Sequence, residues 1–288
     1  MENKLFTNEE EIIALYDKVD LVIDHSREET FNRCQQEALY SYELSLTPLN
    51  QDSDALDFGS RLHKYLETYD EKAWEGYKEI GKHKRDHRTR QKGIAISQLY
   101  KEKYGSSDHD RFNIISQETK FGFIQQKDGQ KILIKGSIDQ VLQSKEDDTL
   151  WVNEFKHSAA YNDITYFQPY YLGNQVRYYL EGVRRLYPKA TIGGVIINLF
   201  QVTKEVTDEA DLVRKEIAIE DMNIAPLLGV DTASEWLRAR ADKYWKRNTG
   251  ACRRYNKICP FFQVCKYGMN DLAVMASYKE KGKNEWHL

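Results

Sequence analysis

Two adjacent apolar segments, each carrying a carboxylate, constrain the fold of this chain most strongly. Residues 131–142 (KILIKGSIDQVL) and 150–158 (LWVNEFKHS) are separated by a short polar turn, and their composition predicts two neighbouring β-strands. Asp139 lies on the first strand, and Glu154 and Lys156 lie on the second. Side chains alternate along a strand, so Glu154 and Lys156 face the same side, about 7 Å apart. Because Asp139 can reach the same point from the neighbouring strand, the sequence predicts a sheet with two acids and an amine at one place.

These three side chains suit the metal-assisted hydrolysis of a phosphodiester. Two carboxylates favour a hard cation of the Mg²⁺ type, because such ions prefer oxygen ligands. A lysine beside the ion can hold an attacking water and help to deprotonate it. Glu118, on a strand predicted over 113–124, is a candidate for a further carboxylate, with a plain exposed strand residue as the alternative. Taken alone, an E-x-K triplet is more often part of a solvated strand face, so the interpretation depends on the motifs around it.

A helix predicted over 54–80 carries a candidate metal ligand, His63. Apolar side chains recur at helical spacing, at Phe58, Leu62, Tyr65, Leu66 and Tyr69. Gly59 lies one turn before His63. A glycine inside a helix costs about 1 kcal/mol relative to alanine, so we expect a close approach at this position. Neutral imidazole is a common metal ligand, and the alternative is a histidine that makes a hydrogen bond at the edge of the core.

A second helix, predicted over 167–186, places Gln175 and Tyr179 on one face. The two residues are four positions apart, which makes them neighbours on a helix surface. An amide and a phenol together can hold a phosphate, a base edge or a catalytic lysine. The alternative is a surface pair without a role.

The four cysteines suggest a metal site. Cys34 lies in TFNRCQQEALYSY, on a helix predicted to begin at Ser26, and the other three lie together in ACRRYNKICPFFQVC. Four thiolates can enclose a cubane iron–sulfur cluster or bind a tetrahedral zinc ion. The first residues, MENKLFTNEEEIIALYDKVD, contain no apolar signal core, so we do not expect disulfides. Four inert buried thiols are the alternative.

Together and in this order, these elements resemble the PD-(D/E)XK nuclease superfamily. They are most similar to its RecB-type branch with an iron–sulfur cluster, which includes CRISPR-associated adaptation nucleases and the nuclease domains of bacterial recombination helicase–nucleases. The resemblance runs from about Ser26 to Cys265. Two departures are the replacement of the superfamily's proline by Ile138 and a Cys252–Cys259 gap that is longer than a C-x-x-C. The second departure keeps zinc open as an alternative.

The resemblance implies a role for each matching residue. The GxxxH helix is matched by Gly59 and His63, the G-x-x-D strand by Gly136 and Asp139, the E-x-K strand by Glu154 and Lys156, and the Q-x-x-x-Y helix by Gln175 and Tyr179. The implied metal ligands are His63, Asp139, Glu154 and the carbonyl of Phe155, and the implied catalytic residues are Asp139, Glu154, Lys156, Gln175 and Tyr179. The implied ligands of a 4Fe–4S cluster are Cys34, Cys252, Cys259 and Cys265.

The resemblance also implies the fold and the activity. The expected fold is α/β, with a restriction-endonuclease-like core, a central mixed sheet flanked by helices, and N- and C-terminal segments joined by a four-cysteine cluster. We expect one nuclease domain over 1–288, with its core at about 54–220 and cysteine-cluster segments at about 26–46 and 231–268. The implied function is that of a Mg²⁺- or Mn²⁺-dependent deoxyribonuclease, an exonuclease acting on single-stranded DNA or DNA ends in recombination or repair. The alternative is a non-catalytic DNA-binding or assembly subunit on the same scaffold.

Local charge has to provide any contact with DNA, because the net charge of the 288 residues is −3. The first candidate is GKHKRDHRTRQKG, with a solvated helix or loop as the alternative, and its basic residues are Lys82, Lys84, Arg85, Arg88 and Arg90. RARADKYWKR and the pair Arg253 and Arg254 are further candidates.

The remaining expectations concern partners and location. No G-x-x-x-x-G-K-[ST] phosphate loop is present, so a separate helicase or recombination protein must supply any unwinding. No apolar run is long enough to cross a bilayer, which predicts no membrane partner. We expect a cytoplasmic protein, bacterial or phage-encoded, and leave an oligomer open.

Overall fold

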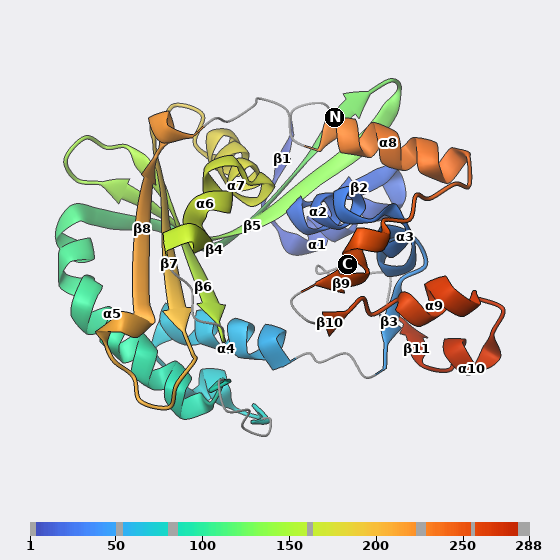
Figure 1. The fold of residues 1–288 in the computed structure, drawn as a ribbon. Coiled ribbons are helices and arrows are strands. Elements are labelled where there is room, and N and C mark those ends of the chain that lie inside the picture. The colour runs from blue at the N-terminus through green and yellow to red at the C-terminus, as the bar shows by residue number, and fades with distance from the viewer. Residues whose placement is uncertain are drawn as a thin grey trace. The chain divides into compact units, whose positions relative to one another are not determined.

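A computed structural model describes residues 4–49, 54–79, 86–159, 164–222, 229–254 and 257–281 (Figure 1). The chain forms two compact units. The cysteine unit consists of Met1–Gln51, Lys120–Gly136 and Ala225–Leu288, and the sheet unit consists of Asp52–Thr119 and Ser137–Ile224. The nuclease core expected at about 54–220 therefore lies in the sheet unit, apart from 120–136. The single domain expected over 1–288 stays a prediction.

A mixed sheet forms the middle of the sheet unit. Its strands follow the order β4-β5-β6-β7-β8, and their bounds are Phe112–Lys127, Gln130–Ser144, Leu150–Ser158, Ile192–Gln201 and Leu212–Ala218. β6 pairs antiparallel with β5 and parallel with β7, whereas β8 returns antiparallel to β7. A parallel pair requires a crossover connection, and the chain between β6 and β7 forms it with α6 (Gln168–Leu172) and α7 (Asn174–Leu186).

Helices cover both faces of this sheet. Successive side chains of β6 point to opposite faces. Glu154 bonds to side chains of α7, whereas Phe155 belongs to a buried cluster with residues of α4 (Asp54–Thr68) and α5 (Arg90–Arg111). Figure 1 shows α7 and the pair α4 and α5 on different sides of the strands. The expected fold class, a central mixed sheet flanked by helices, is confirmed.

The cysteine unit combines short helices with parts of the long strands. β1 (Leu5–Phe6) pairs with β4, and β2 (Leu21–Ile23) runs parallel to β5. Its longer helices, α2 (His25–Arg33) and α8 (Val230–Ala241), pack through Phe31 and Trp236, whose rings stack with centroids 4.8 Å apart. The other elements are α1 (Glu9–Ile13), α3 (Gln35–Ala38), the π-helix η2 (Leu39–Glu43), β3 (Leu46–Pro48), β9 (Arg253–Arg254), β10 (Lys257–Ile258), α9 (Phe262–Tyr267), α10 (Leu272–Met275) and β11 (Tyr278–Glu280), which pairs with β3.

Short 3-10 helices occur in both units, at Tyr16–Lys18 (η1), Glu71–Trp74 (η3), Ile164–Phe167 (η4), Glu209–Asp211 (η5), Ile219–Asp221 (η6) and Thr249–Cys252 (η7). In the ranges that the structure describes, no helix is both long enough and apolar enough to span a bilayer.

Three predicted helices differ from the structure. The helix predicted over 54–80 ends at Thr68, where Tyr69 has a φ of +53°, and η3 follows it. Local chemistry explains the other two. The helix predicted over 167–186 is divided at Gly173, where the backbone is extended and an added Cβ would lie 2.4 Å from the carbonyl oxygen of Pro169. The helix predicted from Ser26 begins at His25 instead, because Asp24 is its N-cap and accepts a hydrogen bond from the backbone N–H of Arg27. That helix ends before Cys34, which is extended.

Gly93 on α5 allows the helix to pack directly against Trp74, and this contact yields a prediction. An added Cβ would lie 2.2 Å from the buried Trp74 ring. We expect Gly93→Ala to lower the free energy of unfolding by about 1–3 kcal/mol through overpacking, as measured by urea denaturation.

Gly105→Ala on the same helix is the matched control, because its nearest neighbour would be Cγ of Lys101 at 3.5 Å. It should leave the free energy of unfolding unchanged or raise it by up to about 1 kcal/mol, since alanine favours the helix. Equal effects of the two substitutions would contradict the packing argument.

Candidate metal centre

The two acids identified in the sequence lie inside the sheet unit, where the pairing of β5 and β6 ends. The backbone register of these strands runs to the pair Gln140 and Asn153. Past this pair, the side chain of Asp139 takes the place of a backbone acceptor: its Oδ2 accepts a hydrogen bond from the N–H of Phe155 at 2.8 Å. Asp139 is 9% exposed and Glu154 is 1% exposed. Both carboxylates are therefore largely removed from water.

The carboxylate of Glu154 has one crowded oxygen and one oxygen without a donor. Oε1 accepts hydrogen bonds from Gln175 Nε2 and from the hydroxyl of Tyr179, each at 3.0 Å. It also forms an ion pair with Lys156 Nζ at 2.5 Å. Oε2 is buried, and no hydrogen-bond donor within the described ranges reaches it. Leaving a buried charged oxygen unsatisfied is costly, and a bound cation removes that cost.

Gln175 and Tyr179 thus both donate hydrogen bonds to Glu154. The sequence left open whether this pair holds a phosphate, a base edge or the lysine. In the structure the amide of Gln175 also donates to the Tyr179 oxygen at 2.6 Å, so the two side chains form one unit beside the carboxylate. Together they orient Glu154.

A second group of donor atoms surrounds Asp139. His63, Glu118 and Asp139 each offer an atom within 4.8 Å of the others. His63 Nδ1 lies 3.5 Å from Asp139 Oδ1 and 3.9 Å from Glu118 Oε1. His63 Nε2 lies 3.0 Å from the carbonyl oxygen of Phe155. The tautomer decides whether Nε2 donates to this carbonyl or offers its lone pair, and with the lone pair on Nε2 the ring and the carbonyl oxygen are close enough to bind one ion together.

Glu118 approaches this group through an unusual backbone. Its φ is +44°, in the left-handed region that residues other than glycine rarely adopt. Strained backbone of this kind is concentrated at functional sites. Its position supports the interpretation of Glu118 as a further carboxylate of the site.

The carboxylates of Glu154 and Asp139 repel one another in this buried site. Burial and the charge of Asp139 raise the pKa of Glu154 to about 7. Burial lowers the pKa of Lys156, but the charges of Glu154 and Asp139 outweigh it, so that the pKa of Lys156 lies above its ordinary value. Burial and Glu154 raise the pKa of Tyr179 well above its ordinary value, so the phenol keeps its proton and donates. A cation between the carboxylates offsets their repulsion.

These residues fit a hard divalent ion. Carboxylate and carbonyl oxygens with one imidazole nitrogen are ligands that Mg²⁺ and Mn²⁺ accept. The structure brings together all the residues that the sequence analysis placed in the metal and catalytic site, namely His63, Asp139, Glu154, Phe155, Lys156, Gln175 and Tyr179.

His157 is a residue of this region that the sequence analysis missed. An added Cβ at Gly59 would lie 2.8 Å from Cε1 of His157, which confirms that a close approach explains the glycine. Burial, followed by the nearby His63, lowers the pKa of His157 to about 4, so its ring stays neutral. Its only signal in the sequence is its position after Lys156, on the face of β6 that packs on α4.

A buried polar network lies on the face of β6 opposite Glu154. Asn153 Nδ2 donates to Gln140 Oε1 at 2.8 Å, across the last pair of the β5–β6 register. Asn198 Nδ2 donates to Asn153 Oδ1 at 2.6 Å and to the carbonyl of Glu154 at 3.3 Å. Arg214 Nε donates to Asn198 Oδ1 at 2.8 Å. These bonds tie β5, β6, β7 and β8 together beside the two acids.

The basic run that was proposed to contact DNA is described only in part. Lys82, Lys84 and Arg85 lie outside the described residues. Arg88 forms an ion pair with Asp86, and Arg90 lies 2.6 Å from Glu71. A DNA contact at this run stays a prediction.

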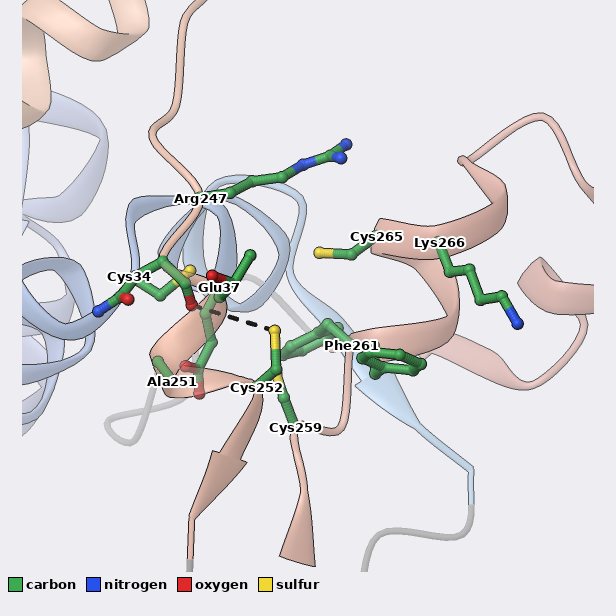
Figure 2. A pocket seen from close by; sticks show the side chains of 12 residues that line it. Cys34, Glu37, Arg247, Ala251, Cys252, Cys259, Phe261, Cys265 and Lys266 are labelled. Atoms are coloured by element: carbon green, nitrogen blue, oxygen red, sulfur yellow. Dashed lines mark hydrogen bonds between the residues drawn. The ribbon is translucent and has the colours of Figure 1, made fainter.

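All four cysteines line one pocket of about 250 Å³ in the cysteine unit (Figure 2). Cys34 lies between α2 and α3, Cys252 ends η7, Cys259 follows β10, and Cys265 lies on α9. The N–H of Cys259 donates to the carbonyl of Cys252 at 2.8 Å. Burial, with the neighbouring Glu37, raises the pKa of Cys259 to about 11. Since metals bind thiolates, a positively charged group is needed to hold these sulfurs deprotonated.

The position of Glu118 yields a prediction about metal affinity. Glu118→Gln keeps the shape of the side chain but removes its charge, so we expect the affinity for Mn²⁺ to fall by a factor of at least about ten. Isothermal titration and the electron paramagnetic resonance signal of free Mn²⁺ measure the change. Glu146→Gln, on the exposed turn after β5, is the matched control and should bind as the wild type does. An unaltered affinity and stoichiometry in Glu118→Gln would exclude Glu118 from the ion's surroundings.

Comparison with known proteins agrees with this geometry. A model of the PD-(D/E)XK nuclease superfamily matches residues 24–266, a span that contains His63, Asp139, Glu154 and the cysteines. A solved structure described as "Crystal structure of SSO0001" aligns with 14% identity over 89% of this chain and 93% of that chain, with a TM-score of 0.43, a likeness too distant to carry an argument. No curated protein matches the chain. With a buried acidic pair, a neighbouring lysine and a family match over most of its length, the chain belongs to the PD-(D/E)XK nuclease superfamily.

Proposed function

We propose that the protein is a Mg²⁺- or Mn²⁺-dependent deoxyribonuclease whose ion is bound by His63, Asp139, Glu154 and the carbonyl of Phe155. The observation that carries this proposal is the carboxylate of Glu154, which has three donors on Oε1 and, among the described residues, none on the buried Oε2. Bound at this place, the ion would polarise the phosphate and lower the pKa of a coordinated water.

The side chains around the ion have separable tasks. Lys156 keeps its charge, because the two acids hold its pKa above the ordinary value, and it can orient the attacking water and attract the phosphate. Gln175 and Tyr179 position Glu154 through Oε1. Glu118 adds negative charge on the Asp139 side of the site.

The proposed substrate is single-stranded DNA or a DNA end, and the proposed reaction is exonucleolytic, as part of recombination or repair in the cytoplasm of a bacterium or its phage. Support comes from the resemblance to the RecB-type branch, with Gly59 and His63 before the acids and the cysteines on either side. A separate helicase or recombination protein would then open the duplex.

We further propose that the cysteine pocket holds a 4Fe–4S cluster. A tetrahedral zinc ion with Zn–S bonds of about 2.3 Å brings its sulfurs to about 3.8 Å from one another. The described cysteines line the same pocket, yet no three of their sulfurs lie within 4.8 Å of one another. One upstream cysteine and three downstream cysteines match the pattern of the RecB-type branch, and this resemblance supports a cluster over a single ion. It would link the segment around Cys34 to the C-terminal segment and so restrict the unfolded chain.

Digestion of defined DNA tests the proposed activity. With Mg²⁺ or Mn²⁺, the wild type should degrade end-labelled linear DNA and leave closed circular DNA intact. Asp139→Asn and Lys156→Gln should each lower the rate by a factor of about 10² or more, because the ion and the water lose a partner. Circular dichroism and thermal unfolding show whether each variant is folded.

The outcome separates the proposal from its main alternative. Tight DNA binding by the wild type without any cleavage would favour a non-catalytic DNA-binding or assembly subunit. Cleavage of closed circles would contradict the exonuclease assignment and keep the nuclease. Folded Asp139→Asn that cuts at the wild-type rate would refute the assigned site.

The cofactor is tested by its colour and composition. Protein purified without oxygen should be brown, with a broad absorbance near roughly 400 nm and about four iron atoms per chain. Cys265→Ser should lose most of the iron, whereas Asp139→Asn, in the other unit, should retain it. A colourless protein with one zinc per chain would replace the cluster with the zinc alternative.

A further inference from the structure

Two tyrosines on the crossover between β6 and β7 form a pair outside the metal centre described above. Tyr166 lies in η4, and Tyr170 follows four residues later in α6. Their hydroxyl oxygens are joined by a hydrogen bond of 3.4 Å. Their rings are tilted by 44°, with centroids 5.9 Å apart. We call Tyr166 and Tyr170 the tyrosine pair.

The crossover holds the tyrosine pair to the elements of the metal centre. α6 packs on η4 and on α7, and α7 packs on β6. Figure 1 shows α6 beside α7. The two helices are joined by a close turn at Gly173, where an added Cβ would lie 2.4 Å from the carbonyl oxygen of Pro169. The pair therefore lies on the side of the sheet where Gln175 and Tyr179 bond to Glu154.

Electrostatic interactions connect the pair to two residues of the metal centre. Burial lowers the pKa of Lys156, whereas the charges of Glu154 and Asp139 raise it above its ordinary value, and the phenol of Tyr166 adds to this rise. Burial and the neighbouring Tyr166 raise the pKa of Tyr170 above its ordinary value, and Glu154 contributes to the same rise. Because such interactions weaken with distance, they place the Tyr166 phenol near the Lys156 ammonium.

The pair and the lysine are partly exposed, whereas the acid beside them is buried. The side chain of Lys156 is 26% exposed and that of Glu154 is 2% exposed. Both tyrosines of the pair are half-buried. Phe167, whose ring meets that of Tyr166 edge to face at 5.4 Å, is 1% exposed and anchors the segment in the core. The phenols are therefore open to a substrate that reaches Lys156.

The hydrogen bond within the pair leaves one hydroxyl proton for an external acceptor. The Tyr170 hydroxyl donates to the Tyr166 oxygen. Each phenol has one proton, so this bond does not use the proton of Tyr166. Among the described residues, no acceptor lies within hydrogen-bond distance of that proton. A phosphate oxygen beside Lys156 is a suitable acceptor, because hydrogen bonds to charged oxygens are stronger than those to neutral ones.

We propose that the hydroxyl of Tyr166 donates a hydrogen bond to a nonbridging oxygen of the phosphate that Lys156 attracts, and that Tyr170 orients this hydroxyl. The inference rests on the proposed function, which makes DNA the substrate. Tyr166 is then a catalytic residue that touches the substrate, and Tyr170 is a positioning residue. A neutral donor held in place in this way stabilises charge that develops on the phosphate in the transition state.

Removal of single hydroxyls tests the contact. Tyr166→Phe should lower the rate of single-stranded DNA cleavage with Mn²⁺ by a factor of about 10–10², because the transition state loses one donor. Tyr170→Phe should cause a smaller loss, since the Tyr166 hydroxyl remains but is no longer oriented. Tyr171→Phe, on the same helix, is the matched control and should cut at the wild-type rate, because its hydroxyl bonds to no described residue. Isothermal titration should show wild-type affinity for Mn²⁺ in all three variants.

Sulfur substitution in the substrate distinguishes a direct contact from an indirect effect. An oligonucleotide with one phosphorothioate at the cleaved linkage is prepared as separate Rp and Sp isomers, which replace different nonbridging oxygens. Sulfur accepts hydrogen bonds weakly. For one isomer, the ratio of the wild-type rate to the Tyr166→Phe rate should fall toward one, and for the other it should stay as large as for the phosphate. Equal ratios for the phosphate and both isomers, or a Tyr166→Phe variant that cuts at the wild-type rate, overturn the proposal.

Binding without turnover separates this inference from the proposed function. With Ca²⁺ in place of Mn²⁺, fluorescence anisotropy should show that Tyr166→Phe binds a labelled single-stranded oligonucleotide about threefold or more weakly than the wild type. Tyr171→Phe should bind as the wild type does. A wild type that binds DNA but never cuts it, with weaker binding by Tyr166→Phe, contradicts the proposed function and leaves the phosphate contact standing. A wild type that neither binds nor cuts DNA contradicts both.

Discussion

The burial of the Glu154 carboxylate is the constraint around which the sheet unit is organised. A charged group that is 1% exposed is unfavourable unless nearby groups replace its lost water. An amide, a phenol and an ammonium do so on one oxygen, and they come from α7 and from β6 itself. The second oxygen has no such donor within the described ranges. This asymmetry leaves one side of the carboxylate for a cation.

Asp139 and His63 depend on the same arrangement. Asp139 lies where the backbone pairing of β5 and β6 ends, and its side chain replaces the missing acceptor for the N–H of Phe155. His63, on α4, places its Nε2 3.0 Å from the carbonyl oxygen of that same residue. One peptide segment of β6 thus orients an acid from one strand and an imidazole from a helix, because both polar groups of Phe155 are free of strand pairing on that side.

The polar network on the opposite face explains how the strand positions are maintained. Asn153 lies next to Glu154, and its side chain bonds to Gln140 on β5 and Asn198 on β7. From Asn198 the bonds continue to Arg214 on β8. Hydrogen-bonded amide side chains restrict the register of the strands more strongly than apolar contacts do. A shift of the register by one residue would bury polar groups without hydrogen-bond partners. These hydrogen bonds therefore fix the relative position of Asp139 and Glu154 from the opposite face of the sheet.

The positions of several of these side chains could be predicted from the sequence because they lie in segments with a clear period or spacing, whereas their roles follow from the family resemblance and stay predictions. Alternation along β6 placed Glu154 and Lys156 on one face, and the four-residue spacing of Gln175 and Tyr179 placed them together on α7. The sequence did not reveal His157 at Gly59, because that contact joins α4 to β6 across long sequence separation. Nor did it reveal the interruptions at Cys34 and Gly173, where extended backbone ends or divides a helix.

By itself, the sequence determined the types of donor groups, their strands and helices, and the proximity of three of the four cysteines along the chain, since these follow from local pattern. Only the tertiary structure decided which atoms of these groups come into contact. It placed Gln175 and Tyr179 on Oε1 of Glu154, it brought Glu118 to His63 and Asp139, and it gathered the four cysteines around one pocket. The reason is that these contacts join residues far apart in the chain, and a local pattern contains no information about the packing that brings distant segments to within a few ångströms.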